Sequence, residues 1–452
     1  MDSTRDQHVG TVFRGLLNDI KRRPEDAAKD LGITVEQINR IIAGNEKLSL
    51  ELIEKACVTW PLNERDFFPI HDDCPSGIRI MRAAEGASSA RIMARGGAPY
   101  YEYRDTVMSR VAPFRPEWIK ELCVVDDNNP ENPLVQWNNG HFMHQFTYFI
   151  GPVNFYYKNR SGEKKVAVMN TGDSMYISPF IPHTFTTRKN AQGELGLILA
   201  LTYGDRIAGD AHRELGVLGP DLSSGFFGDF RSAEAASAAL LCFFQNCLSM
   251  SDETLASAAE IPLSRFHSMR LGESLPTPDE RLRLAAALNV NVRDIMPPES
   301  MDEGVVIKKQ ASTRSWEFPA DVAHYFCREL AASNFLPNSK ALEMEIRQSQ
   351  FDAPDIRVGL HQYAYNIGSS DVIVHWSYQG KSFSDVLEPG DSVYCKPFLE
   401  HAFTGATGKM LVLRIGGHLG SDALRDLSAI GADYVGRVVR ESSQWFNPEG
   451  KR

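Results

Sequence analysis

The sequence lacks the features that would direct it into a membrane or out of the cell. No stretch approaches 18 uninterrupted apolar residues, and the N-terminal segment MDSTRDQHVGTVFRGLLNDIKRR has no apolar core of the kind found in secretion signals. The seven cysteines are an odd number without a CxxC pair, which favours reduced thiols over a disulfide framework. We therefore expect a cytoplasmic protein with no membrane partner.

Positive charge is also in short supply. The 48 Lys and Arg residues face 58 Asp and Glu residues, for a formal net charge of −10. A nucleic-acid or anionic membrane surface selects for excess positive charge, so neither is expected as the dominant partner. The rest of the composition, 43% hydrophobic and 23% charged, is typical of a globular protein. At 452 residues the chain is too long for one ordinary domain and suggests about three, or two copies of something composite.

A helical segment occurs twice in the chain. Residues 25–69 resemble residues 253–297. In both copies a helix gives way to a turn, a second helix, a Gly-containing break and a further helix, and both end in an Arg-Asp-hydrophobic-hydrophobic-Pro stop. Ile33 aligns with Ile261 at an offset of 228 residues. This order of elements is that of the helix-turn-helix of small regulators.

A β-rich segment also occurs twice, downstream of each helical copy. GDSMYISPFIPHTF (172–185) matches GDSVYCKPFLEHAF (390–403), and HQFTYFIG (144–151) matches HQYAYNIG (361–368). Alternating apolar residues separated by Gly and Pro turns predict short strands, and the paired motifs look like a cupin, a double-stranded jelly roll. The predicted fold class is α+β, a helix-turn-helix-like domain plus a cupin, present twice. The expected domains are 1–80 (helical), 81–220 (cupin with the metal site), 221–305 (helical) and 306–452 (cupin without an intact metal site).

The charge of the first helical copy argues against a DNA-binding role. Residues 1–75 contain ten Lys and Arg against fourteen Asp and Glu, a net of −4. The helix that would enter the major groove offers Gln37, Asn39 and Arg40 but no basic stripe. A helical module packed against the barrel is favoured, and a ligand-responsive transcription regulator is kept as an alternative.

The segment WNNGHFMHQFTYFIGP (137–152) raises the question of a metal site. Side chains on a strand alternate between its two faces, so His141 and Gln145 share a face and His144 points the other way. Together with His183 of the second motif, an intact strand nominates His141, Gln145 and His183 as ligands. A β-bulge would shift this parity, and the alternative interpretation is three polar residues that line the barrel.

A carboxylate ligand is missing from this set. Six residues before His183, where parity would place an inward carboxylate, the chain has Ile177. Two imidazoles and an amide would leave Fe(II) with its full charge, which favours a dianionic substrate. The second copy retains Gln362 and His401 but has Val358 in place of His141, so a second tight metal site is not expected.

With NNGH (138–141), GDSxxxxPFxPH (172–183) and a helix-turn-helix ahead of each cupin, the sequence resembles the non-haem iron enzymes of phosphonate metabolism. The resemblance covers nearly the whole chain. Hydroxyethylphosphonate dioxygenase carries Glu where this chain has Ile177. The methylphosphonate-forming branch has the isoleucine, and a glutamine four residues after the first histidine, as Gln145 is here. The tandem arrangement argues against the single-copy hydroxypropylphosphonate epoxidase as the closest relative.

The resemblance implies a cofactor, a substrate and a set of residues that bind it. It implies Fe(II) and O2, with 2-hydroxyethylphosphonate as the small-molecule substrate, cleaved to methylphosphonate and CO2. Motif matches carry over Arg95, Tyr103 and Asn138 as phosphonate-binding residues, and Lys21 as a lysine that binds substrate and assists catalysis. The alternatives without a role in substrate binding are a surface charge for Arg95 and a core aromatic for Tyr103.

Other interpretations remain open at this point. A dioxygenase that gives hydroxymethylphosphonate and formate is the first, and a cupin of the non-catalytic or sugar-isomerase type with Zn(II) or Mn(II) is another. Ligand type admits Fe(II), Mn(II) or Co(II), and only dioxygen chemistry favours iron. The sequence leaves the oligomeric state open: a homo-oligomer is compatible with it, although a tandem repeat can replace a homodimer. It also leaves open whether Arg414 of the second copy reaches the first site.

Overall fold

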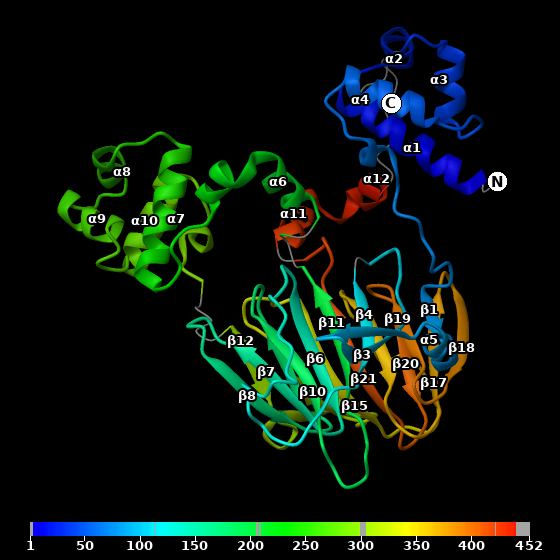
Figure 1. The fold of residues 1–452 in the computed structure, drawn as a ribbon. Coiled ribbons are helices and arrows are strands. Elements are labelled where there is room, and N and C mark those ends of the chain that lie inside the picture. Colours follow the sequence, from blue (N-terminus) through cyan, green and yellow to red (C-terminus); the bar gives the residue numbers. More distant parts are fainter. Residues whose placement is uncertain are drawn as a thin grey trace. The chain divides into compact units, whose positions relative to one another are not determined.

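The structure is a computed structural model that describes residues 3–112, 114–204, 207, 209–298, 304–420 and 422–439. The chain divides into two compact units. Figure 1 labels their helices and strands. The first comprises residues 1–79, 109–113 and 419–452, and the second comprises residues 80–108 and 114–418. None of the described helices is long and apolar enough to cross a membrane.

The first unit is helical. Its helices are α1 (Ser3–Asp19), α2 (Pro24–Leu31), α3 (Val35–Ile42), α4 (Leu50–Thr59), the 3-10 turn η1 (Glu64–Phe67), α11 (Asp422–Ile430), η5 (Ala432–Tyr434) and α12 (Val435–Val439). Gly32 ends α2 in the left-handed region, at φ +60°, and the Thr34 hydroxyl accepts a hydrogen bond from the Gln37 amide to cap α3. Ile38 and Ile41 then share the face of α3 that lies in the buried core.

A second helical group occurs in the other unit, and its last five members repeat the order of the first five elements of the first unit. Its members are α6 (Asp210–Ser223), η2 (Ser224–Phe226), α7 (Ala233–Cys247), α8 (Asp252–Ala258), α9 (Leu263–Arg270), α10 (Pro278–Leu288) and η3 (Val292–Ile295). Thr277 and Glu280 form a capping box at the start of α10, with Pro278 at its first position. Leu255, Phe266 and Leu284 form part of its buried core.

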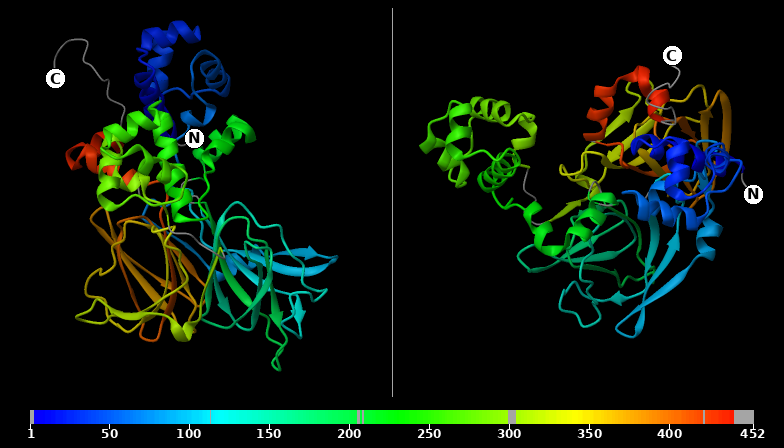
Figure 2. Two further views of the ribbon diagram at one scale, coloured as in Figure 1. Left: turned by 90° about the vertical axis from the view of Figure 1, so that its left-hand side faces the viewer. Right: turned by 90° about the horizontal axis from the view of Figure 1, so that it is seen from above.

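The strands of the second unit form two β-sandwiches, which lie side by side (Figure 2). The first sandwich joins a seven-stranded sheet in the order β12-β9-β6-β11-β4-β3-β2 to a four-stranded sheet in the order β5-β10-β7-β8. The strands are β2 (Arg91–Arg95), β3 (Ala98–Asp105), β4 (Arg115–Glu121), β5 (Val124–Val125), β6 (His144–Ile150), β7 (Val153–Lys158), β8 (Lys164–Met169), β9 (Ser174–Ile177), β10 (His183–Arg188), β11 (Leu197–Tyr203) and β12 (Val305–Lys308).

The second sandwich has a similar plan. A seven-stranded sheet in the order β1-β19-β16-β21-β15-β14-β13 accompanies a three-stranded sheet in the order β18-β17-β20. The strands are β1 (Ile78–Met81), β13 (Ser315–Phe318), β14 (Tyr325–Glu329), β15 (Ser339–Ile346), β16 (His361–Asn366), β17 (Val372–Tyr378), β18 (Lys381–Leu387), β19 (Ser392–Cys395), β20 (Glu400–Thr404) and β21 (Lys409–Ile415). The short helix α5 (Ala83–Ser88) and the 3-10 turn η4 (Gln310–Ser312) lie just after β1 and β12.

The two sandwiches exchange their edge strands. β12, which precedes the second sandwich in the chain, pairs with β9 of the first, and β1, which precedes the first sandwich, neighbours β19 of the second. Side-chain bonds join the two sandwiches as well: the Tyr148 hydroxyl donates to the Glu343 carboxylate at 2.6 Å. Each sandwich therefore completes its large sheet with a strand that belongs to the other half of the repeat.

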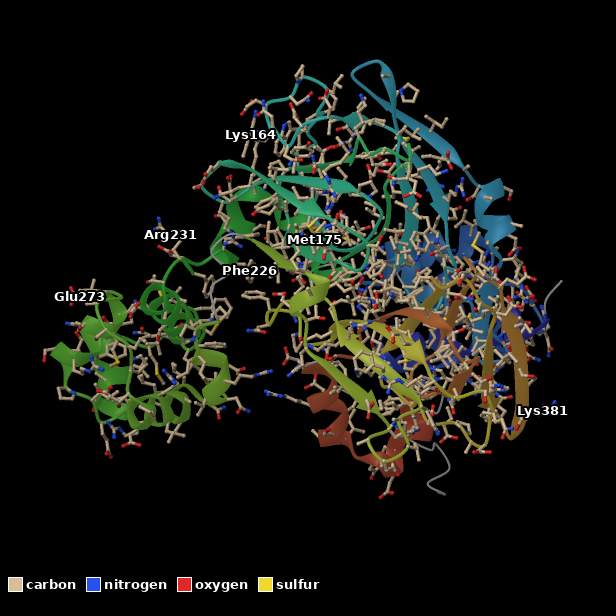
Figure 3. All side chains as sticks on the ribbon, turned by 90° about the horizontal axis from the view of Figure 1, so that it is seen from below. Lys164, Met175, Phe226, Arg231, Glu273 and Lys381 are labelled. Carbon is tan, nitrogen blue, oxygen red and sulfur yellow. The ribbon has the colours of Figure 1, made fainter. Side chains whose placement is uncertain are left out.

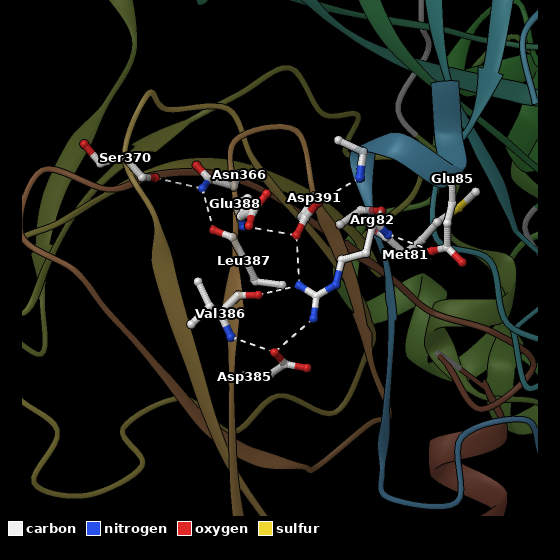
Figure 4. A network of polar contacts seen from close by, with 12 residues as sticks. Met81, Arg82, Glu85, Asn366, Ser370, Asp385, Val386, Leu387, Glu388 and Asp391 are labelled. Atoms are coloured by element: carbon white, nitrogen blue, oxygen red, sulfur yellow. Dashed lines mark hydrogen bonds and ion pairs between the residues drawn. The ribbon is translucent and has the colours of Figure 1, made fainter. Parts of the chain in front are cut away.

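A polar network secures this exchange at the start of α5 (Figure 4). The Arg82 guanidinium donates to the carboxylates of Asp391 and Asp385, each at 2.9 Å, and to the carbonyl of Val386. The Ala83 amide donates to the other Asp391 oxygen at 2.7 Å. Because Asp391 is only 2% exposed, these bonds satisfy a carboxylate that is removed from water.

Apolar side chains fill the space between the two sheets of the first sandwich. Met175 on β9, labelled in Figure 3, packs with Phe149 of β6 and Phe155 of β7, and all three are fully buried. Alternation of inward and outward residues along each strand produces this core. All seven cysteines lie in the described ranges, and each is a free thiol.

Candidate metal centre and active site

Two histidines and a glutamine meet at one end of the first sandwich. His141 Nε2 lies 3.1 Å from Gln145 Oε1, and the rings of His141 and His183 are 5.2 Å apart in an edge-to-face arrangement. Gln145 is the second residue of β6, and His183 begins β10 on the other sheet. The structure thus brings together the three residues that the sequence predicts as ligands.

Both imidazoles are oriented for metal binding. His141 Nδ1 donates to the carbonyl of Met143 at 2.8 Å, and His183 Nδ1 donates to the carbonyl of Ile181 at 2.8 Å. A backbone carbonyl on one ring nitrogen fixes the tautomer and places a lone pair on Nε2. In His183 this lone pair faces the Asn138 amide nitrogen, which a bound cation would displace. Burial lowers the pKa of His183 to about 3, so its ring is neutral at physiological pH.

His141 and Gln145 converge, but alternation along one strand, which was expected from the sequence, is not the cause. β6 begins at His144, so His141 lies in the preceding loop and not on the strand. The loop is fixed by Gly140, which has φ +73° and on which a Cβ atom would lie 2.7 Å from the backbone of Phe180. The Phe180 amide also donates to the carbonyl of His141 at 2.8 Å. The premise of one continuous strand is wrong, and backbone packing between two motifs positions His141.

The Gln145 side chain is held in one orientation. Its Nε2 donates to the Thr147 hydroxyl at 2.9 Å, which turns its Oε1 toward His141. Both residues are at most 4% exposed and share one face of β6. The neighbour opposite Gln145 on β9 is Ile177, also buried, and no cluster of three or more His, Cys, Asp or Glu residues suited to a metal occurs in the described ranges. None of the three candidate ligands, His141, Gln145 and His183, is a carboxylate.

Asn138 lies beside His183. Its Oδ1 accepts hydrogen bonds from the backbone amides of His183 (2.8 Å) and Gly140 (3.0 Å), and its Nδ2 lies 3.2 Å from His183 Nε2. The Asn138 side chain therefore braces the loop that carries His141 against the strand that carries His183. Its Nδ2 faces the place where the ligand atoms meet.

Arg95 and Tyr103 lie on the adjoining strands β2 and β3. One terminal nitrogen of Arg95 donates to the carbonyl of Gln136 (3.1 Å) and contacts the Thr184 hydroxyl (3.4 Å), one residue after His183. Its guanidinium covers the ring of Tyr101, 4.6 Å from the centroid. Tyr103 meets the Tyr101 ring edge-to-face, and burial raises the pKa of its hydroxyl to about 12. A neutral Tyr103 hydroxyl can donate a hydrogen bond to an anion.

His144 Nδ1 lies 2.6 Å from the Tyr176 hydroxyl on β9. The His144 side chain is on the same face of the sheet as Tyr203, opposite to the face that carries Gln145.

Lys21 belongs to the first unit, in the turn after α1, where its exposed ammonium donates to the carbonyl of Asp19 at 2.7 Å. Its role at the metal centre stays a prediction.

Sequence reasoning missed three residues that shape the site. Thr147 orients Gln145, and Gln136 and Thr184 hold Arg95. Thr147 could have been found, because it lies two residues from Gln145 and so shares its face of the strand. Gln136 carries no such local signal, since its carbonyl meets Arg95 only through the tertiary fold.

These features define a β-sandwich with an internal two-histidine, one-amide centre, the kind of site that suits a divalent metal. No protein-family model matches the chain. The structure is similar to that of 2-hydroxyethylphosphonate dioxygenase from Streptomyces albus, solved with the substrate 2-hydroxyethylphosphonate and Fe(II) bound, with a TM-score of 0.93, 37% identity and coverage of 99% of this chain and 100% of the other. PhpD, solved with cadmium atoms, shares the fold at 18% identity, with a TM-score of 0.73 and coverage of 96% and 99%.

The sequence comparison defines the family. The chain is 51% identical over 441 residues to methylphosphonate synthase from Nitrosopumilus maritimus (strain SCM1), covering 98% of this chain and 96% of the relative. The chain belongs to the methylphosphonate synthase family.

Proposed function

We propose that this protein uses Fe(II) and O2 to cleave the carbon–carbon bond of 2-hydroxyethylphosphonate, giving methylphosphonate and CO2. The observation that carries the proposal is the convergence of His141, Gln145 and His183 without a carboxylate, in a chain that is 51% identical to a methylphosphonate synthase. One substrate and one O2 balance methylphosphonate, CO2 and water, so no external reductant is required.

The donor set fits Fe(II). The ligands would be His141 Nε2, His183 Nε2 and Gln145 Oε1, and the Nδ1 atom of each imidazole already donates to a backbone carbonyl. Fe(II), when bound, supplies the redox chemistry that activates O2. Since none of these ligands carries charge, the centre keeps two positive charges and attracts a dianionic phosphonate.

Residues around the centre would bind the phosphonate group. Arg95 offers a planar pair of donors, Tyr103 a neutral hydroxyl and Asn138 an amide, and we assign all three to the phosphonate oxygens. The aromatic rings under Arg95 exclude water from one side of the guanidinium. We further propose that Lys21 binds the substrate and assists turnover, because a mobile ammonium can follow the change in charge at the reacting oxygens.

We also propose a division of the chain into four domains. We assign residues 1–80 and 221–305 to helix-turn-helix-like modules, and residues 81–220 and 306–452 to two cupins, of which the first holds the metal. The exchanged strands β1 and β12 support the tandem plan because each sandwich is completed by the other half. Seven free thiols agree with a cytoplasmic location, which we include in the proposal.

The dioxygenase that forms hydroxymethylphosphonate and formate is the second candidate, because the Streptomyces albus enzyme resembles this chain closely in structure. A DNA-binding regulator is less well supported. Gln37 and Arg40, which would contact bases, both bond to the Glu46 carboxylate, at 2.7 and 2.8 Å. Their hydrogen-bonding groups are therefore already engaged with an acidic residue.

Phosphorus NMR tests the proposal. Metal-free protein is loaded with Fe(II) without oxygen, given 2-hydroxyethylphosphonate and then exposed to air. A methylphosphonate signal is expected, whereas hydroxymethylphosphonate alone would overturn the assigned product.

In Gln145→Glu the added negative charge should raise KM for the dianionic substrate by about tenfold while the protein still binds iron. Gln192→Glu, which adds the same charge on an exposed loop, is the matched control.

A further inference from the structure

The second sandwich carries an arginine where the first has its metal centre. Arg414 on β21 lies opposite Gln362 on β16, just as Thr202 lies opposite Gln145 in the first sandwich. Arg414 Nε donates to Gln362 Oε1 at 2.9 Å. The amide oxygen that would serve as a ligand is therefore occupied by a guanidinium.

The histidine of this second centre is engaged as well. His401 Nδ1 donates to the carbonyl of Leu399 at 2.9 Å, which leaves its Nε2 as an acceptor for the Gln362 amide at 2.7 Å. Val358 occupies the position that corresponds to His141. The positive charge at this place is therefore that of the Arg414 guanidinium instead of a metal ion. Arg414 therefore belongs to the second sandwich, not to the first metal centre.

The charge of Arg414 is not balanced. The two terminal nitrogens of its guanidinium form no hydrogen bond or ion pair with any residue in the described ranges. Burial lowers the pKa of Arg414, and the groups that oppose this effect are the thiols of Cys327 and Cys395 rather than a carboxylate. A partly buried guanidinium without an anionic partner carries a substantial desolvation cost.

A second cation lies directly opposite on the adjacent strand. Lys340 of β15 is the cross-strand partner of Arg414, so the two side chains share one face of the sheet. Lys340 is exposed and likewise has no anionic partner among the residues that the structure describes. Like charges directly opposite each other destabilise a sheet unless an anion lies between them.

We propose that Arg414 and Lys340 form a binding site for a small oxyanion in the second sandwich. The two free nitrogens of Arg414 present a planar fork that matches two oxygens of one anion, and Lys340 adds a mobile charge at the exposed side. Carboxylates, bicarbonate and phosphonates share the required pair of oxygens. The site depends on residues of the second sandwich alone and does not rest on the function proposed for the first.

Isothermal titration calorimetry on metal-free protein tests this site. The Arg95→Met background removes the guanidinium of the first centre, and methylphosphonate, bicarbonate and formate are titrated separately. At least one anion should bind with a stoichiometry of one, and the relative affinities identify its source. Adding Arg414→Met should abolish this binding, and adding Lys340→Met should weaken it by roughly tenfold.

A matched control separates a specific site from general charge effects. Lys381 on β18, labelled in Figure 3, is also exposed, and Lys381→Met should leave the affinity unchanged. Lys340→Met changes an exposed side chain and keeps the test valid if Arg414→Met does not fold. Absence of binding in the Arg95→Met protein would overturn the proposal. Equal affinity in the Lys340→Met and Lys381→Met proteins would also overturn it.

Discussion

Asp173 and Asp391 occupy the same turn of the two sandwiches, and each binds a basic residue that precedes the other sandwich. Asp391 accepts from Arg82 at 2.9 Å, and Asp173 accepts from Lys309 at 2.9 Å. The correspondence extends to the backbone, because the Ala83 amide donates to Asp391 and the Gln310 amide donates to Asp173. The edge-strand exchange is therefore secured twice by the same device.

Replacing Asp391 should destabilise the fold. Asp391→Asn removes the charge that Arg82 binds and leaves an amide nitrogen near donors, at a position only 2% exposed. We expect a loss of about 2 kcal/mol, at the low end for a buried pair because Arg82 itself is 42% exposed. Differential scanning calorimetry measures the change. Asp385→Asn is the control: Asp385 is 43% exposed and should cost much less, so equal losses would contradict this account.

Removing the Thr147 hydroxyl should weaken metal binding. In Thr147→Val, Gln145 Nε2 loses its acceptor and the side chain is no longer held with Oε1 toward His141. Loss of such a supporting bond typically lowers metal affinity by about 10–100-fold. Titration of the metal-free protein with Fe(II) under nitrogen gives the affinity. Thr147→Ser keeps the hydroxyl and should restore it, and a Ser variant as weak as Val would show a packing effect instead.

Stability should fall in acid because of buried histidine in the second sandwich. Burial lowers the pKa of His401, 1% exposed, from 6.5 to about 4. Below about pH 6.5 the unfolded chain takes up a proton that the folded chain does not, so the free energy of unfolding decreases until about pH 4. The loss from this residue is about 3 kcal/mol.

Calorimetry from pH 7 to pH 4 on the native protein and on His401→Gln checks this expectation. Gln cannot titrate and keeps a polar group for Gln362, so the variant should lose less stability over the same range. Parallel curves for the two proteins would contradict the assignment. His71, an exposed histidine, changed to Gln is the matched control and should follow the native curve.

Lys21→Ala should reduce turnover without reducing iron content. Lys21 is exposed and is not one of the three candidate metal ligands. Because its proposed role is to act on bound substrate, its loss should not change iron binding. We expect kcat to fall by roughly tenfold or more while iron per chain, measured by atomic emission, stays constant. Lys29→Ala, another exposed lysine of the same helical unit, should change neither quantity. Equal loss of turnover and iron would contradict the assignment.

The sequence by itself was enough to identify the repeats and to predict which residue types converge at the candidate metal centre. Both depend on local pattern: turn residues and apolar periodicity recur at a fixed offset, and histidine and glutamine are strong metal donors wherever the fold exposes their lone pairs. The choice between His141 and His144 also followed from local pattern, although the continuous strand assumed for it does not exist, since β6 begins at His144.

Tertiary structure alone decided what depends on distant segments. His141 reaches Gln145 because Gly140 packs against Phe180, and β12 completes a sheet whose other strands precede it by more than a hundred residues. Arg414 could not be placed from sequence, because nothing in its neighbours shows that its guanidinium meets Gln362. Periodicity encodes which face a residue occupies, whereas the partner across a sheet is set by the register between strands, which only the folded chain fixes.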